Sequence, residues 1–424
     1  MIDKNLFLYN LAITAIFKDE ALYLKEWIDY HLLAGVEHFY LYNNDSTDDY
    51  KEILAPYVEK NLVTLTDVPG RLMMFPAYHD AIDKYRFECR YMAFIDIDEF
   101  IYPKTNKNIV EVIDEILSQD KNAAGLGINW QLFGSSGLEK ADYSRGVLER
   151  FTRRAESDWS DSTGMGGNTY RKTIDNPRLI RYRINPHFAY YFDGKYAINS
   201  NGEHIEPWYG NKPICVDKIV LNHYYAKSKE EYINKKMPKG SCCMDSSYNM
   251  NGFHSYDCNE VFDDGILKYQ AARAENFSLV SDDQRINRVV NTLFRTLNQN
   301  PNDMPSEFFN GKLETFLTCR AVAEKLDFKI GEHSAEEYAL AWIYHTLKKT
   351  DCASRAEIQM FLKALPEILS RPFPICKDIK DLAQNFVLPG YCEHLKNGNI
   401  LTGTDDWKMH IDMLYMQKLL ISLK

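Results

Sequence analysis

The sequence predicts an α/β fold followed by a helical part, and three observations lead to this prediction. Short apolar runs rich in β-branched and aromatic residues alternate with helical segments over the first 100 residues. A strand-rich, irregular stretch follows from about 123 to 225. A glycine-poor, helix-rich region begins near residue 265. The 424 residues are enough for two domains, which we expect over 1–265 and 266–424.

The first part begins with a regular alternation of strands and helices. In order, the pattern predicts strands over 11–17, 38–44 and 62–68 and a fourth strand that holds the carboxylates and ends at residue 98, separated by helices over 18–36, 49–60 and 78–86. Helices of this length between strands imply right-handed crossovers and therefore a parallel sheet. Ligands bind such sheets at the carboxyl ends of the strands, where we expect the polar clusters 43–49 and 96–99.

The later part of the chain changes from strands to helices. Further strands are expected over 123–134, 169–174, 179–184, 187–192 and 218–226. Capping boxes at 334–337 and 354–357 indicate helix starts, and 407–424 reads as an amphipathic helix. Three roles for this helical part remain open: packing on the first domain, forming a homodimer, or peripheral contact with a membrane.

Composition excludes several classes of protein. The net charge of −10 argues against a sequence-wide affinity for nucleic acid, which needs cationic side chains to neutralise phosphates. No run of 18 apolar residues is present, so we expect no transmembrane segment. The first residues read as a strand and lack a basic leader. The nine cysteines are scattered without a CxxC pair, which predicts reduced thiols and a cytoplasmic location, with the inner face of a membrane as the alternative.

Two carboxylates stand inside an apolar run, in FIDIDEF. Ionised carboxylates are costly to bury unless they are paired or bound to a metal. Alternation along a strand puts Asp96 and Asp98 on one side and Ile95 and Ile97 on the other. Two oxygens from one strand suit Mn²⁺ or Mg²⁺ and leave coordination positions for phosphate oxygens.

Two other readings of this pair of acids remain open. The carboxylates of Asp96 and Asp98 are also suited to cap the following segment or to pair with Arg86 or Arg90. Phosphatases of the haloacid-dehalogenase type use Asp-x-Asp at a strand end, normally with Thr or Val two residues after the second Asp. Phe100 stands at that position, which disfavours this class.

Five stretches resemble the family-92 and allied family-2 glycosyltransferases of the GT-A fold. They are KDEALYLKEWIDYHLLAGVEHFYLYNNDSTDD (18–49), MAFIDIDEF (92–100), NWQLFGSSG (129–137), VLERF (147–151) and LNHYYAKSKEEYINKK (221–236), in that order. The resemblance covers roughly 10–240. It implies a GT-A catalytic domain with a Rossmann-like mixed sheet that binds a nucleotide sugar.

The resemblance also implies which residues bind the donor, a UDP-linked hexose. Ala15, Phe17 and Glu20 match positions that line the nucleoside pocket. Asn44 stands where related enzymes often have an Asp that reads the uracil, which leaves the nucleotide open, and Asp45 follows in the same turn. The alternative for this turn is a helix N-cap. The remaining implied donor-binding residues are Asp96, Ile97, Trp130 and Lys172.

A metal site and a set of acceptor residues follow from the same resemblance. His223 matches a histidine that completes a Mn²⁺ or Mg²⁺ site with Asp96 and Asp98, although a lone histidine among apolar residues is often a core residue. Lysines cluster after it, at Lys227, Lys229, Lys235, Lys236 and Lys239, suited to a diphosphate. The acceptor is expected to meet the donor sugar at Phe133, Gly134 and His187.

The catalytic base and a basic stripe complete the expected site. Glu149 in VLERF is the first candidate for the base, and Asp193 is the reserve. The alternative for Glu149 is an exposed acid paired with Arg153. Alternation along a strand would put Arg181 and Arg183 on one face, as a phosphate-binding stripe or as a solvated one.

Together these features predict a metal-dependent, inverting glycosyltransferase. Its acceptor would be a hydroxyl of a glycan or lipid-linked molecule, in the synthesis of a surface polysaccharide or glycoconjugate. The competing hypothesis is a non-catalytic protein that binds sugars or nucleotides on a transferase fold. Proteins of that kind usually lose the metal carboxylates, whereas Asp96 and Asp98 are present here.

Overall fold

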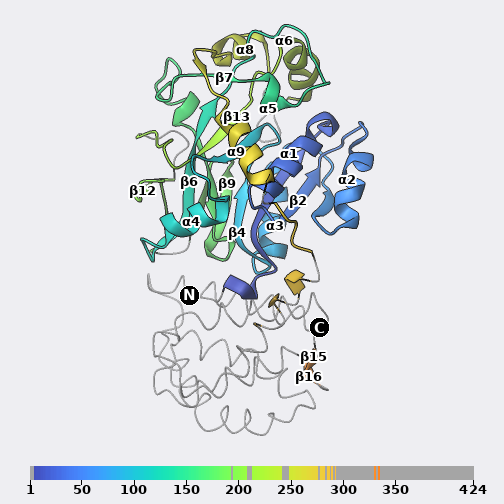
Figure 1. The fold of residues 1–424 in the computed structure, drawn as a ribbon, viewed down its shortest axis with the longest axis vertical. Coiled ribbons are helices and arrows are strands. Elements are labelled where there is room, and N and C mark those ends of the chain that lie inside the picture. Colours follow the sequence, from blue (N-terminus) through green and yellow to red (C-terminus); the bar gives the residue numbers. More distant parts are fainter. Residues whose placement is uncertain are drawn as a thin grey trace, which may run out of the picture. The chain divides into compact units, whose positions relative to one another are not determined.

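The computed structural model describes 4–191, 194–207, 213–240, 248–275, 277–281, 284–286, 288–289, 292, 329–330 and 333–334. The chain divides into two compact units: Tyr9–Asp282, and Met1–Leu8 together with Asp283–Lys424. The first unit contains the sheet, which Figure 1 shows with its helices, and every element discussed below as part of the site.

The helices of the first unit are α1 (Ala21–Leu33), α2 (Tyr50–Glu59), α3 (Met74–Tyr85), α4 (Ile109–Leu117), α5 (Val147–Arg150), α6 (Lys229–Glu231), the π-helix η4 (Tyr232–Lys236), α7 (Met237–Lys239), α8 (Met250–Tyr256) and α9 (Gly265–Ala274), with 3₁₀ turns η2 (Gly167–Thr169) and η3 (Pro177–Leu179). Its strands are β1 (Tyr9–Phe17), β2 (His38–Asn43), β3 (Val63–Asp67), β4 (Cys89–Phe94), β5 (Glu99–Pro103), β6 (Ala123–Leu132), β7 (Arg153–Arg154), β8 (Arg171–Asp175), β9 (Ile180–Asn185), β10 (Phe188–Tyr191), β11 (Tyr196–Ile198), β12 (His204–Ile205), β13 (Ile219–His223) and β14 (Val261–Phe262). The second unit has the 3₁₀ turn η1 (Lys4–Leu6) and the antiparallel pair β15 (Lys329–Ile330) and β16 (His333–Ser334) among its described residues.

The predicted parallel sheet is confirmed for the first four strands. Within the described residues, ten strands form one sheet in the order β12-β11-β6-β8-β4-β1-β2-β3, with β13 pairing both β5 and β6. β1, β2, β3 and β4 are mutually parallel, and β8 runs antiparallel between β4 and β6. Phe17 pairs with Asn43, which pairs with Asp67, so these three strands end at the same level. Their carboxyl ends therefore form one edge, as the sequence predicted for this mixed α/β fold.

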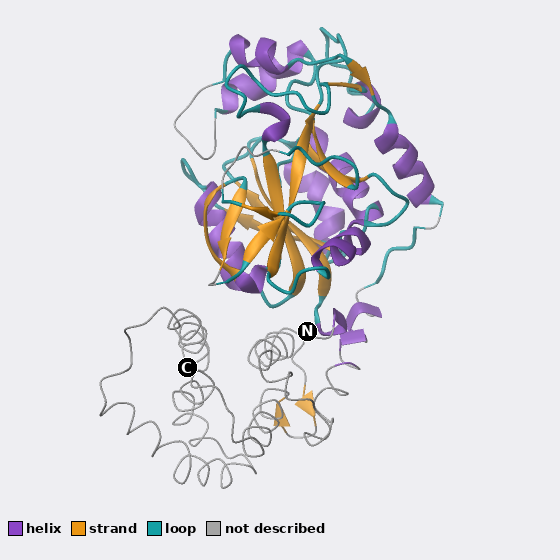
Figure 2. Cartoon of the chain, turned by 90° about the vertical axis from the view of Figure 1, so that its left-hand side faces the viewer, coloured by secondary structure: helices purple, strands orange, loops and turns teal. Residues whose placement is uncertain are grey.

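The sheet is buried between two layers, and helices lie on both sides of the strands in Figure 2. On one face, alternate residues of β1, such as Leu11 and Ile13, belong to one buried hydrophobic cluster with side chains of α1, α2 and α4. On the other face, α3 packs against β1 and β9, and its Tyr85 stacks on Tyr40 of β2 with 4.0 Å between ring centroids. This double burial explains why the strands read as nearly continuous apolar runs in the sequence.

Three local differences from the sequence prediction affect the site. β4 ends at Phe94, so Asp96 and Asp98 lie in the connection to β5 rather than within a strand. Arg181 is exposed and Arg183 is fully buried, so the predicted common face of these two arginines is wrong. The cause is that Arg183 turns inward, where it forms an ion pair of 2.6 Å with the buried Asp175.

The boundary of the first unit differs from the expected division at residue 265. Helix α9 packs against α1, and Arg273 donates a hydrogen bond to the Leu33 carbonyl at 3.2 Å. The first unit therefore extends to Asp282. Among the helix starts expected further on, Ser334 belongs to β16, and the rest of 334–337, with 354–357 and 407–424, lies outside the described residues.

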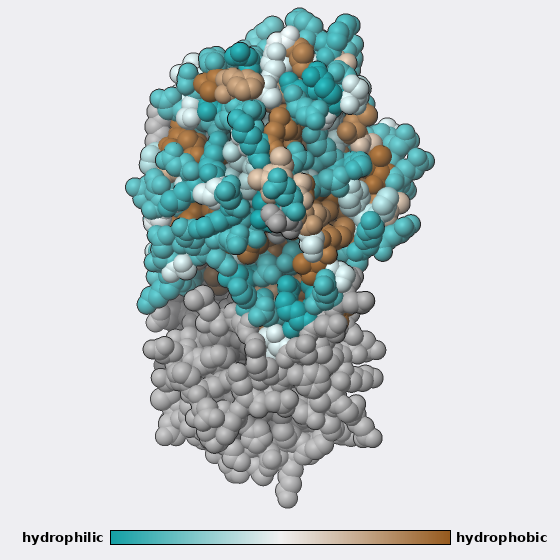
Figure 3. Space-filling view, viewed as in Figure 1, coloured by the Kyte–Doolittle hydropathy of each residue, from teal (hydrophilic) through white to brown (hydrophobic). Residues whose placement is uncertain are grey.

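No helix in the described part of the chain combines the length and the apolar character that crossing a membrane requires. On the face shown in Figure 3, hydrophobic side chains form separate patches within a mainly hydrophilic surface.

Candidate functional site

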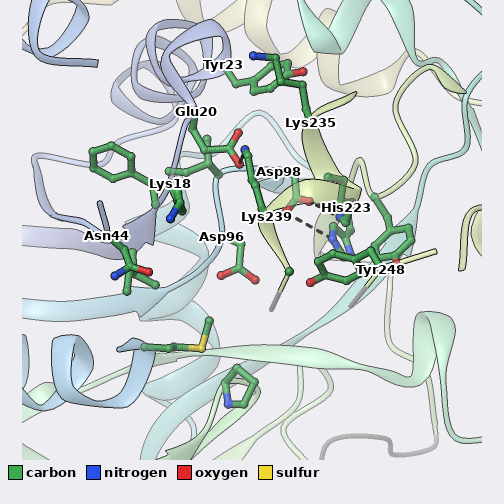
Figure 4. Close-up of a pocket in the computed structure, with 18 of the residues that line it drawn as sticks. Lys18, Glu20, Tyr23, Asn44, Asp96, Asp98, His223, Lys235, Lys239 and Tyr248 are labelled. Atoms are coloured by element: carbon green, nitrogen blue, oxygen red, sulfur yellow. Dashed lines mark hydrogen bonds and ion pairs between the residues drawn. The ribbon is translucent and has the colours of Figure 1, made fainter. Parts of the chain in front are cut away.

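A cavity of about 860 Å³ opens at the edge where the parallel strands end. Its walls come from the turn after β1, the connection between β4 and β5, strands β6, β8 and β13, and the segment 225–240 that follows β13. Figure 4 shows Asp96 and Asp98 between Asn44 on one side and His223 and Tyr248 on the other. Sequence-distant elements therefore meet where the sheet topology predicts a ligand.

One end of the cavity is formed by Phe17, Lys18, Glu20 and Asn44. The Asn44 side chain donates through Nδ2 to the carbonyls of Val68 and Gly70, both at 2.8 Å. Both donors of this amide are thus used to hold the 68–70 loop, and only its oxygen is left to face a ligand.

Asp45, predicted to bind the donor, supports the same loop. Its Oδ2 accepts a hydrogen bond from the Gly70 backbone N–H at 2.8 Å, and it is not among the residues that line the cavity. Its own backbone has a φ of 55°, in the left-handed region that Asp and Asn tolerate in turns.

The two central carboxylates are each paired with a lysine. The Lys172 ammonium, almost fully buried, lies 2.9 Å from Asp96 Oδ2, and Lys236 Nζ lies 2.9 Å from Asp98 Oδ2. Although burial alone would raise it, the ammonium of Lys236 and the neighbouring His223 hold the pKa of Asp98 well below its usual range. Arg90, considered as a partner from the sequence, instead pairs with Asp114 at 2.7 Å.

Glu99, the residue after Asp98, contacts three other residues at the centre of the site. This role of Glu99 was not predicted from the sequence. Its Oε2 accepts from the Asp96 backbone N–H at 2.8 Å, and its Oε1 accepts from the Trp130 indole N–H at 2.7 Å. Lys172 Nζ is 3.5 Å from Oε2, and the Glu99 side chain is fully buried. Burial raises the pKa of Glu99, while Lys172 acts in the opposite direction. Its position directly after the two aspartates was the available signal.

The residue types at the centre fit a divalent cation. Nε2 of His223 is 3.5 Å from Oδ1 of Asp98, and the Asp96 side chain is about one-third exposed to the cavity. His223 Nδ1 is buried without a hydrogen-bond partner in the described structure, whereas Nε2 is the nitrogen that faces Asp98. No group of three or more His, Cys, Asp or Glu side chains forms a ready-made metal site among the described residues. A cation bound through Asp98 Oδ2 would have to displace Lys236 from that oxygen.

The segment that carries the lysines is held by a buried ion pair. Ser228 opens α6 with a capping box to Glu231. Glu231 also receives two hydrogen bonds from Arg150, at 2.7 and 3.1 Å. The π-helix η4 follows, and this rare geometry, which recurs at functional sites, carries Lys236.

Aromatic side chains form the opposite part of the cavity wall. The His187 ring stacks on Tyr170, with centroids 4.9 Å apart, and Trp130 contacts both His187 and His223. His187 Nδ1 donates to the Arg171 carbonyl at 3.0 Å, since a carbonyl only accepts. Burial lowers the pKa of His187 to about 3. The ring is therefore neutral near pH 7, and its Nε2 is an acceptor.

The structure brings together most, but not all, of the residues predicted from the sequence. Those that line the cavity are Phe17, Glu20, Asn44, Asp96, Ile97, Asp98, Trp130, Lys172, His187 and His223. Ala15 and Phe133 are fully buried in the core. Gly134 and the exposed Glu149 are also outside the cavity lining. Asp193 lies outside the described residues.

Several cavity residues were not predicted as site residues. They are Lys18, Arg71, Leu72, Tyr170, Asn185, Tyr225, Tyr248 and Tyr256. Tyr225 stands two residues after His223 in LNHYY, and Lys18 begins the first matching stretch, so both had a usable signal. Tyr256 ends α8, and the others come from loops and strand ends without a local pattern.

The fold and the cavity define an α/β protein whose ligand site lies at the carboxyl ends of parallel strands. Residues 11–260 match the sequence model of glycosyltransferase family 92. The chain therefore belongs to this family, and the family resemblance and fold class predicted from the sequence are confirmed.

Individual relatives match shorter stretches. A glycosyltransferase family 92 protein of Ricinus communis is 26% identical over 147 residues, which is 34% of this chain and 26% of that protein. The galactan beta-1,4-galactosyltransferase GALS2 of Arabidopsis thaliana is 33% identical over 100 residues, 21% of this chain and 19% of the relative. The chain thus spans about a quarter or less of these relatives' length. The solved structure of S. aureus TarS 1–349 with UDP aligns over 84% of this chain and 92% of that one, at 12% identity and a TM-score of 0.31.

Proposed function

We propose that the chain is a glycosyltransferase that moves a sugar from a UDP-linked donor to a hydroxyl of a glycan or glycoconjugate acceptor. Family membership supports the class of reaction. The observation that carries the proposal is the placement of Asp96 and Asp98, with Lys172 and Lys236, in one cavity at the carboxyl edge of the sheet. Paired carboxylates and ammonium groups at this edge are suited to a cation and a diphosphate.

Each wall of the cavity has a task in this proposal. The Phe17 and Asn44 end takes the nucleoside, and the Asn44 oxygen accepts from an imide N–H such as that of uracil. Asp96, Asp98 and His223 would hold Mn²⁺ or Mg²⁺, which supplies Lewis-acid stabilisation of the leaving diphosphate. The aromatic wall around Trp130 takes the sugars, since rings pack on their apolar faces.

The acceptor hydroxyl would attack the anomeric carbon from the side opposite the diphosphate, and this single displacement inverts the anomeric centre. His187, with its neutral ring and accepting Nε2, is placed to orient a hydroxyl on the aromatic wall. Glu149 and Asp193 stay predictions as proton acceptors.

The proposal is tested by binding first and turnover second. Thermal shift with UDP and Mn²⁺ is measured for the wild type, for Asp98→Asn, and for Asp142→Asn, a control outside the cavity. Ligand at a hundred times its Kd stabilises the native state by about 2.7 kcal/mol. We expect this shift in the wild type and the control, and a much smaller one in Asp98→Asn.

A panel of nucleotide sugars then tests for donor hydrolysis or transfer. Turnover that disappears in Asp98→Asn supports the enzyme. Binding of UDP without turnover of any donor or acceptor on the panel would favour the binding-protein hypothesis, and no binding at all would contradict the proposed function.

A further inference from the structure

One lysine in the cavity wall differs from its neighbours. Lys227 lines the cavity and is only 9% exposed. In the part of the chain that the structure describes, no carboxylate forms an ion pair with its ammonium. Its ammonium instead lies over the electron-rich face of the Tyr23 ring, 4.5 Å from Nζ to the centroid.

The carboxylates nearest to Lys227 already have partners. Lys236 forms an ion pair of 2.9 Å with Asp98, and Lys239 forms one of 2.6 Å with Glu20. Burial lowers the pKa of Lys227, the negative charges of Asp98 and Glu20 act in the opposite direction, and the positive charges of Lys236 and Lys239 lower it further. A buried ammonium without a counter-ion is costly, so an arrangement of this kind calls for an anion that arrives from outside.

The backbone at this position is also unusual. Lys227 has a φ of 51°, in the left-handed region that a side chain with a Cβ rarely adopts. The next residue, Ser228, is the N-cap of α6, and both halves of its capping box with Glu231 are formed, so this backbone position directly precedes a fixed helix start. Strained residues of this kind cluster at ligand sites, where the surrounding structure holds them in place.

We propose that Lys227 binds the diphosphate of the nucleotide donor directly, as an ammonium that forms no ion pair with a carboxylate of the described residues. This inference rests on the proposed function, since it places the phosphates of that donor beside Asp98. An ammonium acts on phosphate as a compact point charge with three donors, and here it is held in place by the Tyr23 ring and the capping box. Lys236 and Lys239 would have to break their ion pairs with Asp98 and Glu20 before they could bind phosphate.

The test is calorimetric titration of the full chain, in the presence of Mn²⁺, with UDP, uridine and inorganic pyrophosphate. Lys227→Met removes the charge and keeps a long side chain, and Lys227→Arg keeps the charge. Lys229→Met is the matched control, because Lys229 is two residues away, is partly exposed, pairs with Glu139 and does not line the cavity. Thermal midpoints of all variants are measured without ligand.

We expect Lys227→Met to raise the Kd for UDP at least tenfold and to leave the Kd for uridine within twofold. The ligand-free midpoint should not fall, because the substitution removes a buried charge that has no carboxylate partner among the described residues. Lys227→Arg should retain most of the UDP affinity, and Lys229→Met all of it. An unchanged Kd for UDP in Lys227→Met would overturn the inference. Equal losses for UDP and uridine would overturn it too, in favour of a structural role.

The remaining measurements distinguish a donor phosphate from some other phosphate, and they distinguish failure of this inference from failure of the proposed function. If Lys227→Met weakens pyrophosphate and not UDP, the residue serves a phosphate other than the donor's, which overturns the inference. If the wild type itself fails to bind UDP, the proposed function fails, and the inference fails with it. Normal UDP binding by Lys227→Met rejects the inference alone.

Discussion

Replacing Glu99 with glutamine tests whether this buried side chain works as a carboxylate. Its two oxygens accept hydrogen bonds from the Trp130 indole and from the Asp96 backbone N–H, at 2.7 and 2.8 Å. The Lys172 ammonium adds a third N–H donor group, and a positive charge, 3.5 Å from Oε2. Three donors around one carboxyl group favour the ionised form, while burial raises the pKa of Glu99 and favours the protonated form.

The expected loss can be worked out from these contacts. Glutamine keeps one acceptor oxygen and puts an NH₂ group where the other was, so either the Trp130 indole or the Asp96 N–H loses its acceptor. A buried donor left without a partner costs about 1–3 kcal/mol, and the weaker contact to Lys172 brings the total to about 2–4 kcal/mol. At about 2 °C per kcal/mol, the thermal midpoint should fall by roughly 4–8 °C.

The assay is thermal unfolding followed by tryptophan fluorescence at pH 7, for the wild type, Glu99→Gln and Glu111→Gln. The control residue is exposed, and its capping box with Asn108 accepts glutamine as well as glutamate. A midpoint for Glu99→Gln within 1 °C of the control would refute the reasoning, because it would mean that Glu99 is already protonated and that glutamine replaces it without loss.

Three further predictions concern other buried charges. Arg150→Met leaves the Glu231 carboxylate buried without its cation, so we expect a loss of about 3–5 kcal/mol in denaturant unfolding; a loss below about 1 kcal/mol would contradict this. Burial lowers the pKa of His31 to about 3 in the folded chain. As the pH falls below 6.5, His31 therefore binds a proton in the unfolded chain but not in the folded one. Stability should therefore drop by up to about 1.4 kcal/mol per pH unit between pH 6 and 5, and the slope should be smaller in His31→Gln. Lys236→Met frees Asp98, so Mn²⁺ titrated without nucleotide should bind more tightly than to the wild type; equal or weaker binding would show that the lysine and the cation do not compete.

The arrangement of the first four strands could be predicted because each strand and each crossover helix has its own local pattern. The sequence also held a clear signal for α4, which the prediction passed over. Asn108 and Glu111 form a capping box, and Ile109, Val112 and Ile113 lie on one buried face. By contrast, β5 could not be read locally, because its pairing partner β13 is far along the chain.

The candidate site was predictable in position and less so in its contacts. Asn44 follows a strand end, as expected for a ligand-binding turn, and it does line the cavity. Its side-chain N–H groups are nevertheless bonded to Val68 and Gly70, in a loop that no pattern in the turn itself reveals. Arg183 shows the same limit, since period-two alternation cannot foresee that Asp175 will draw it into the core.

The pair of acids in FIDIDEF shows where reasoning from sequence stops. Burying two carboxylates requires compensating charge, and that requirement can be read from the local sequence alone. The charges that supply it here are Lys172 and Lys236, 76 and 138 residues away along the chain. Contacts at such separations depend on the whole topology, with β8 inserted beside β4 and the π-helix placed after β13.

The lysine pairs also change what a cation at this centre would have to do. A divalent ion bound through the Oδ2 atoms of Asp96 and Asp98 would have to replace the ammonium groups of Lys172 and Lys236, so its affinity would depend on where those groups can go next. A diphosphate in the same cavity offers Lys236 a new partner, which makes cation and nucleotide favour each other's binding. We therefore expect Mn²⁺ and UDP to bind the wild type more tightly together than separately. In Lys236→Met this mutual effect should shrink, and an undiminished effect would refute the exchange of partners.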